Sequence, residues 1–65
     1  MITALEALRR RRGLTRAALA ERAGLSENTV RRAEHGVYPK SATMVKIAAA
    51  LEWDGEPDQL LREIA

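Results

Sequence analysis

Four residues in one short stretch carry side chains that can bond to the edges of nucleic-acid bases: Glu27, Asn28, Arg31 and Arg32. Arginine can bond bidentately to guanine, asparagine to adenine, and glutamate can accept a hydrogen bond from the amino group of cytosine. A carboxylate beside two arginines would weaken binding to phosphates alone, but it can select one base and penalise others. The alternative for Glu27 is structural, because an acid in the first turn of any helix interacts favourably with the helix dipole.

A helix over about residues 27–35 is expected to position these side chains. Ser26 is a favourable N-cap residue for this helix. Val30 and Ala33 continue an apolar stripe along one of its faces, and Gly36 follows its end. The pattern therefore predicts a short amphipathic helix.

A second helix, over about residues 16–23, is expected just before it. Thr15 is a suitable N-cap, and Gly24 suits the left-handed conformation that ends many helices. Two short helices joined by a few residues including glycine are typical of a helix-turn-helix, whose second helix enters the DNA major groove. The sequence predicts this motif over about residues 16–35, although many helical bundles contain a similar corner.

The remaining segments also favour helices, and no segment alternates apolar and polar residues over the length of a strand. Thr3 and Glu6 have the spacing of a capping box, and Ser41 is a suitable N-cap further along the chain. We expect an all-α fold, a compact bundle of five short helices. The other three helices are predicted over about 4–11, over about 42–51, and near the end of the chain from Pro57, where the last helix carries Leu60, Leu61 and Ile64.

The length and composition limit the possible functions. The chain has 65 residues, enough for one domain, so we expect residues 1–65 to form a single helix-turn-helix domain. It has no cysteine, which excludes disulfides and thiolate metal sites, and no apolar run approaches the roughly 20 residues that span a membrane. His35 is the single histidine and has no nucleophile or base around it in a recognisable arrangement. We expect a cytoplasmic protein that is not an enzyme and holds no metal or cofactor.

Charge is distributed unevenly along the chain. Residues 1–46 hold ten of the eleven Lys and Arg residues and four acidic residues, a net charge of +6. Residues 47–65 hold one Arg and five acidic residues, a net charge of −4. Such segregation favours a basic face for a polyanion with an acidic end held away from it, while the alternative is that both ends are simply solvated surfaces.

Two stretches covering most of the chain resemble a known family. "GLTRAALAERAGLSENTVRRAEHG" followed by "PKSATMVKIAAAL" is similar to the Cro/repressor-type (Xre-like) helix-turn-helix family of DNA-binding proteins. The resemblance implies a lambda-repressor-like bundle whose third helix is the recognition helix. It is carried by Leu19, Ala20, Ala23, Gly24, Ser26, Val30, Glu34, Gly36, Pro39, Thr43, Lys46, Ile47, Ala48 and Leu51.

The resemblance also implies roles for individual residues. The base-reading positions fall on Glu27, Asn28 and Arg32, with Arg31 at a flanking base or a phosphate. An acid at the position of Glu34 commonly pairs with an arginine of the first helix, here Arg9. At the start of the second helix the family usually has a glutamine that contacts a phosphate, but this chain has an arginine, which cannot accept a hydrogen bond. The resemblance implies phosphate contacts by Arg16, Lys40 and Tyr38, and we also expect Thr15 to contact a phosphate.

The resemblance leaves two kinds of partner open. As a bacterial or phage transcription regulator, the chain would bind an operator on double-stranded DNA, associate with the nucleoid, form a homodimer at least on a two-fold-symmetric site, and need no small-molecule effector. As an antitoxin or small regulatory subunit, it would use the same fold to bind protein. A partner or dimer surface on the acidic end could include Trp53, Leu60, Leu61 and Ile64, which could equally belong to the core.

Overall fold

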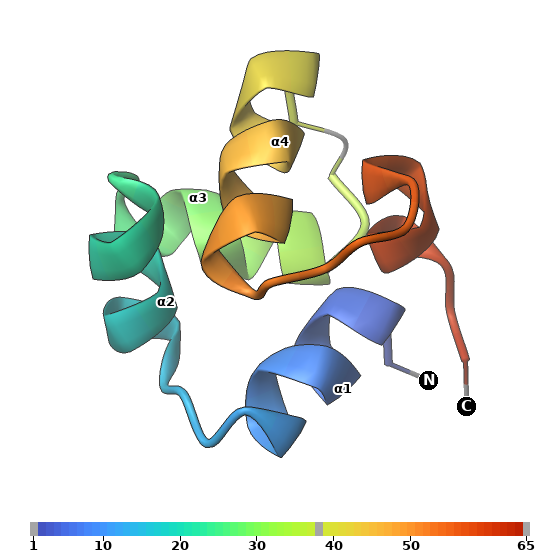
Figure 1. The fold of residues 1–65 in the computed structure, drawn as a ribbon, viewed down its shortest axis with the longest axis horizontal. Coiled ribbons are helices and arrows are strands. Elements are labelled where there is room, and N and C mark those ends of the chain that lie inside the picture. Colours follow the sequence, from blue (N-terminus) through green and yellow to red (C-terminus); the bar gives the residue numbers. More distant parts are fainter. Residues whose placement is uncertain (1, 38, 65) are drawn as a thin grey trace.

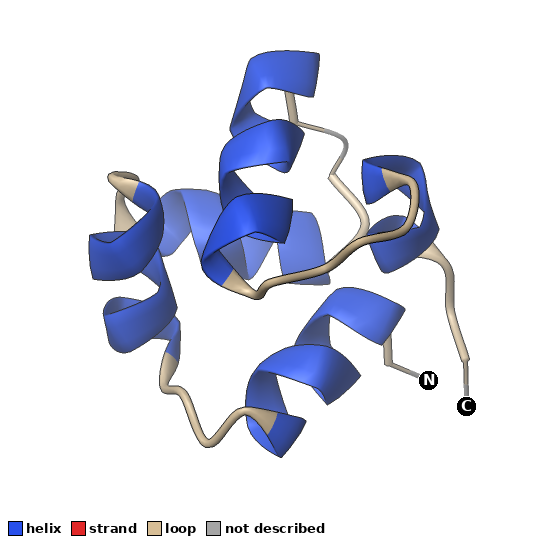
Figure 2. Cartoon of the chain, in the orientation of Figure 1, coloured by secondary structure: helices blue, strands red, loops and turns tan. Residues whose placement is uncertain are grey.

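A computed structural model of the chain describes residues 2–37 and 39–64. This part of the chain is helical, as predicted, with four short α-helices arranged around a common core and a 3-10 helix that closes the bundle (Figures 1 and 2). The elements in chain order are α1 (Ala4–Arg11), α2 (Arg16–Ala23), α3 (Glu27–Glu34), α4 (Ser41–Ala50) and η1 (Pro57–Leu61).

Three of the helix starts are determined by side-chain caps that the sequence predicted. Thr3, Thr15 and Ser26 each accept a hydrogen bond from the backbone N–H three residues later, at 3.2, 3.0 and 3.2 Å. Gly24 ends α2 in the left-handed conformation, with φ of 71°. Each cap satisfies a backbone donor that the first turn of a helix leaves without a partner, which explains why these boundaries follow from local sequence.

Helix α4 begins one residue earlier than the sequence predicted. Ser41, expected as the cap, is its first helical residue, and Lys40 occupies the N-cap position. A lysine side chain has no hydrogen-bond acceptor, so Lys40 cannot cap the helix, and the first turn of α4 has no side-chain cap.

The expected fifth α-helix is a 3-10 helix of five residues, and the prediction that it carries Ile64 is wrong. The chain beyond η1 instead runs beside the N-terminal segment, so the two ends of the described chain lie close together (Figure 1). Backbone N–H groups bond across this contact from Ala4 to Arg62, at 2.7 Å, and from Ile64 to Ile2, at 2.9 Å. This pairing satisfies backbone groups that a longer helix would have satisfied internally.

The core takes side chains from every helix, including η1. Its largest fully buried members are Leu5, Leu19, Val30, Met44, Ile47, Leu51 and Leu60. The assignment of Leu60 to a possible partner surface is therefore wrong, because its side chain is fully buried among those of the other helices. Trp53 and Leu61, also assigned to that surface, are partly buried against the same core. Ile64, the remaining member, is largely exposed, at 57%.

The turn after α4 is shaped around the indole ring of Trp53. The indole Nε1 donates a hydrogen bond to the backbone oxygen of Glu56 at 3.0 Å. Gly55 approaches the ring so closely that a Cβ atom at this position would lie 2.7 Å from Cζ2 and 2.9 Å from Cε2 of the indole. Only glycine fits here without displacing the ring.

We expect Gly55→Ala to destabilise the protein because the indole must shift to admit the new methyl group. Overpacking of this kind costs about 1–3 kcal/mol, and each kcal/mol lowers the melting temperature of a domain this small by roughly 4–8 °C. Thermal unfolding followed by circular dichroism measures the effect, with Asp54→Ala at the neighbouring exposed position as a control. Equal melting temperatures for the two variants would contradict this account of the turn.

Candidate nucleic-acid interface

Helices α2 and α3 form the predicted helix-turn-helix. The turn is held by a hydrogen bond of 2.8 Å from the backbone N–H of Leu25 to the carbonyl of Ala20 in α2. The side chain of Leu25 packs against the core, and this packing stabilises the turn. The angle between the two helices therefore depends on buried contacts and not on the turn alone.

Helix α3 divides its residues between the core and the solvent. Val30, Ala33 and Glu34 are buried. The four residues predicted to bond to bases, Glu27, Asn28, Arg31 and Arg32, are all exposed. Residues three and four apart on a helix are neighbours, so the exposed side chains form one continuous polar surface.

Two of these exposed residues are bonded to each other. The side-chain oxygen of Asn28 accepts a hydrogen bond from Nη2 of Arg31, one turn later. The Asn28 amide nitrogen and the other guanidinium nitrogens of Arg31 remain as donors. The pair presents donors to the solvent and restrains both side chains before any ligand arrives.

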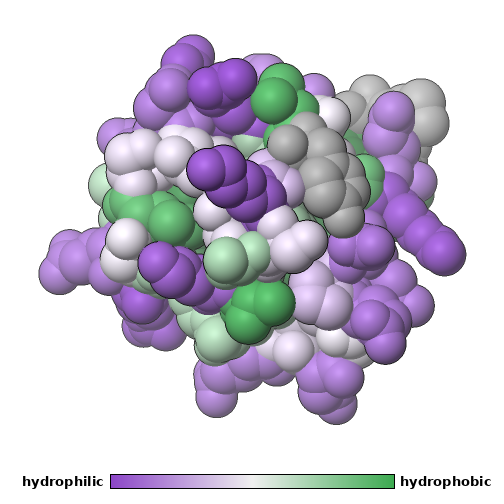
Figure 3. Space-filling model, turned by 90° about the horizontal axis from the view of Figure 1, so that it is seen from above, coloured by the Kyte–Doolittle hydropathy of each residue, from purple (hydrophilic) through white to green (hydrophobic). Residues whose placement is uncertain are grey.

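A cleft of about 470 Å³ lies between α3, the loop that follows it and the start of α4. Arg32 and Lys40 bring two positive charges to its walls, and Thr29 and Thr43 bring two hydroxyl groups, which the sequence analysis did not assign to the site. Figure 3 views the molecule from the end where α4 begins and shows hydrophilic side chains interspersed with smaller hydrophobic patches. The cleft gathers residues from two helices, so no spacing along the sequence could predict it.

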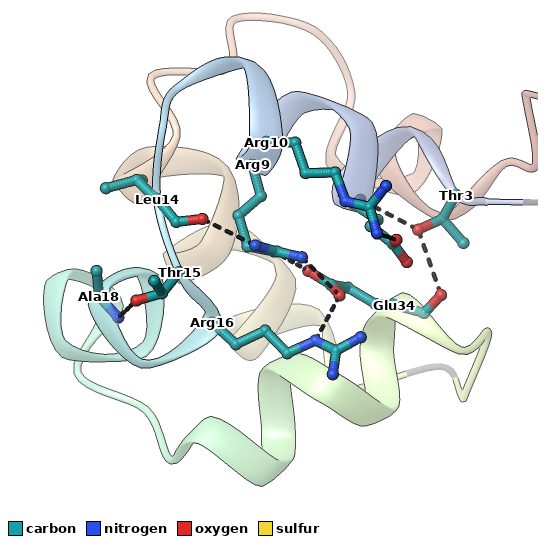
Figure 4. Close-up of polar contacts among 9 residues, drawn as sticks. Thr3, Arg9, Arg10, Leu14, Thr15, Arg16, Ala18 and Glu34 are labelled. Carbon is teal, nitrogen blue, oxygen red and sulfur yellow. Dashed lines mark hydrogen bonds and ion pairs between the residues drawn. The ribbon is translucent and has the colours of Figure 1, made fainter.

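The side chain of Arg16 is directed toward α3 and does not extend freely into solvent (Figure 4). Its Nε donates a hydrogen bond of 2.8 Å to Oε1 of Glu34, and the side chain is 31% exposed. This hydrogen bond raises the pKa of Arg16; burial opposes the increase, and the charges of Glu34, Glu6 and Glu27 add to it. A guanidinium group keeps its charge in proteins, as a phosphate contact requires.

Arg9 bonds the same carboxylate from the opposite side, in the pairing that the resemblance implied. Its Nε lies 2.5 Å from Oε2 of Glu34, and its Nη1 donates to the backbone oxygen of Leu14 at 2.8 Å. The Glu34 side chain is completely buried. A hydrogen bond of 3.3 Å from the Thr3 hydroxyl to the Glu34 backbone oxygen adds a further link between α3 and the start of α1 (Figure 4).

A family model for the helix-turn-helix matches residues 5–52, from α1 to just beyond α4. The chain belongs to the Cro/C1-type helix-turn-helix family. Membership supports sequence-specific DNA binding by a regulator of the Cro/C1 type. Comparisons with curated proteins and with solved structures gave no match.

The other predicted contact residues of this Cro/C1-type domain lie in different settings. Thr15 is exposed, and its hydroxyl oxygen already caps α2. Lys40 is exposed at the start of α4, whereas Tyr38 lies outside the described residues.

Within the described ranges, no helix is long and apolar enough to cross a membrane, and no group of three or more acidic, histidine or cysteine side chains is placed to hold a metal ion.

We expect Glu34→Ala to lower the melting temperature far more than Glu27→Ala. The first change leaves Arg9 and Arg16 without their shared carboxylate, and breaking a buried ion pair costs about 3–5 kcal/mol. The second removes an exposed acid whose interaction with the helix dipole is worth about 0.3–1 kcal/mol. Thermal denaturation of the two variants gives the comparison, and small, equal shifts would show that the ion-pair cluster does not stabilise the fold.

Proposed function

We propose that this protein is a transcription regulator that binds an operator on double-stranded DNA with α3 in the major groove. The observation that carries the proposal is the set of four exposed residues on α3 whose side chains match the edges of base pairs. These residues lie on the second helix of a helix-turn-helix that belongs to a family of DNA-binding regulators, and the second helix of this motif is the one that enters the major groove. Its opposite face is buried, so the polar face is the part of α3 available to DNA.

The direct base contacts are assigned to the exposed face of α3. Arg32 and Asn28 would bond to guanine and adenine, and Glu27 would accept from the amino group of cytosine and repel a phosphate or a carbonyl at a wrong site. Arg31, held beside Asn28, would contact a flanking base or the backbone. In this proposal the carboxylate among the arginines serves selectivity, because it weakens binding wherever no amino group faces it.

Phosphate contacts are assigned to both sides of α3. Arg16 lies at the start of α2, and Lys40 lies at the start of α4 beside the cleft that Arg32 also lines. The absence of a side-chain cap leaves the first-turn N–H groups of α4 available to a phosphate oxygen. Thr15 and Tyr38 are further backbone contacts proposed from sequence. Such contacts determine how α3 lies in the groove, while the bases determine which site is bound.

The biological setting is proposed on the same basis. A helix-turn-helix regulator of bacterial or phage type would bind as a homodimer to two inverted half-sites and act as a repressor by occupying the operator. It would work in the cytoplasm, where the DNA of such hosts lies. Ile64, with 57% of its surface exposed, remains a candidate contact in a dimer, with Trp53 and Leu61 contributing their exposed edges.

Selection from random duplex DNA tests the proposal. We expect the purified protein, at near-physiological salt, to retain duplexes that share two inverted half-sites about one helical turn apart. The selection is repeated with Glu27→Gln. If the base preference changes at one position of the site and the wild type prefers cytosine there, that cytosine is the base that Glu27 selects. Retention without any enriched sequence, abolished as salt rises, would contradict sequence-specific binding and would favour the protein-interaction alternative.

Single substitutions should separate base contacts from phosphate contacts. We expect Asn28→Ala and Arg32→Ala to weaken binding to the selected site by about 1–3 kcal/mol and to relax its sequence preference. Lys40→Ala should weaken binding to all duplexes alike and reduce the salt dependence by about one phosphate contact. Titrations at several salt concentrations measure both effects, with Arg62→Ala as a control for loss of an exposed arginine on the acidic segment. Equal losses on selected and random DNA for Asn28→Ala and Arg32→Ala would contradict base reading by α3.

A further inference from the structure

A single buried carboxylate holds two arginines that come from different helices. The Glu34 side chain at the end of α3 is completely buried, and its two oxygens bond Nε of Arg9 from α1 and Nε of Arg16 from α2 (Figure 4). Arg9 is 10% exposed and completes its bonding with the backbone oxygen of Leu14. All three guanidinium nitrogens of Arg9 bond within the protein, with Nη2 donating to Oε1 of Glu34 at 3.5 Å, whereas Arg16 bonds Glu34 through Nε alone.

The guanidinium group of Arg16 is bonded to the protein through Nε, while its terminal nitrogens remain available to a ligand. Its Nε is engaged with Glu34, but 31% of the side chain remains exposed, and the two terminal nitrogens of the guanidinium carry four further N–H donors. Two arginines around one carboxylate leave the cluster with one net positive charge. An anion that approaches the exposed nitrogens therefore meets an attractive charge whose orientation the buried carboxylate has already restricted.

We propose that Glu34 is a positioning residue of the DNA interface, which holds the Arg16 guanidinium in place for a backbone phosphate. The inference rests on the proposed function, and it assigns a second role to a carboxylate whose pairing with Arg9 would otherwise be only structural. A free arginine loses side-chain entropy when it binds a phosphate, whereas Arg16 has lost part of that entropy on folding. Binding through the terminal nitrogens can proceed while the Nε bond to Glu34 stays intact.

The planar guanidinium is essential to this arrangement. Arginine presents donors on different edges of one rigid group, so it can bond a carboxylate through Nε and a phosphate through its outer nitrogens. Lysine concentrates its donors on one nitrogen at the end of a flexible chain, so a lysine at position 16 would keep the charge and lose the fixed direction.

A double-mutant cycle on DNA binding separates positioning from stability. The proteins are wild type, Arg16→Ala, Glu34→Gln and the double variant, and the probe is a mixed-sequence DNA duplex at low salt, at a temperature where thermal unfolding shows each protein to be folded. We expect Glu34→Gln to weaken binding roughly tenfold in the wild-type background and by less than about twofold when Arg16 is already absent. Equal losses in both backgrounds would overturn the proposal, because a purely structural carboxylate acts independently of Arg16.

Arg16→Lys gives a second test that leaves the bond between Glu34 and Arg9 in place, and it applies even if Glu34→Gln does not fold. We expect roughly tenfold weaker binding with an unchanged salt dependence. The lysine keeps the positive charge but lacks the planar guanidinium that Glu34 holds in one orientation. Binding as tight as that of wild type would overturn the proposal. Arg62→Ala is the matched control at an exposed arginine.

The outcomes also separate this inference from the proposed function. If wild type binds no duplex DNA at low salt, the proposed function fails and the inference fails with it. If wild type binds DNA and neither Glu34→Gln nor Arg16→Lys shows the expected dependence on Arg16, only the positioning role of Glu34 is wrong.

Discussion

The carboxylate of Glu34 is the group on which the arrangement of the first three helices depends. A buried carboxylate without a partner is strongly unfavourable, and the chain neutralises this one from two sides, with Arg9 from α1 and Arg16 from α2. The two ion pairs therefore require α1, α2 and α3 to lie close enough for both arginines to reach this carboxylate. Because Glu34 ends α3, the requirement also determines how the exposed face of that helix is presented.

The helix proposed to read DNA has almost no residue without a role. Of its eight residues, Val30, Ala33 and Glu34 are buried, and Glu27, Asn28, Arg31 and Arg32 form the exposed polar face. A helix this short is marginal in isolation, so its stability comes from packing and from the Ser26 cap. Stability and recognition therefore use opposite faces of the same two turns, which allows the exposed residues to change while the core contacts stay the same.

The structural differences from the sequence-based predictions arise where tertiary contacts outweigh local preference. Leu60 and Leu61 have the pattern of a short helix, but η1 is a 3-10 turn and the chain then pairs with the segment before α1. Leu60 was open to assignment as either core or surface, since an apolar residue near a chain end fits both; its complete burial decides for the core. The bond between Arg16 and Glu34 was not predicted, because the two residues are 18 positions apart and no local rule relates them.

The sequence by itself determined the four α-helices, the side-chain caps of the first three and the helix-turn-helix motif. Thr3, Thr15, Ser26 and Gly24 act on backbone groups within a few residues, so their effects can be predicted without knowing the fold. The exposed positions of α3 likewise follow from helical periodicity. Only the tertiary structure decided that one carboxylate serves two arginines and that Arg32 and Lys40 share a cleft. These contacts join segments whose distance in space depends on how the whole core packs, and the spacing of residues along a chain does not contain that distance.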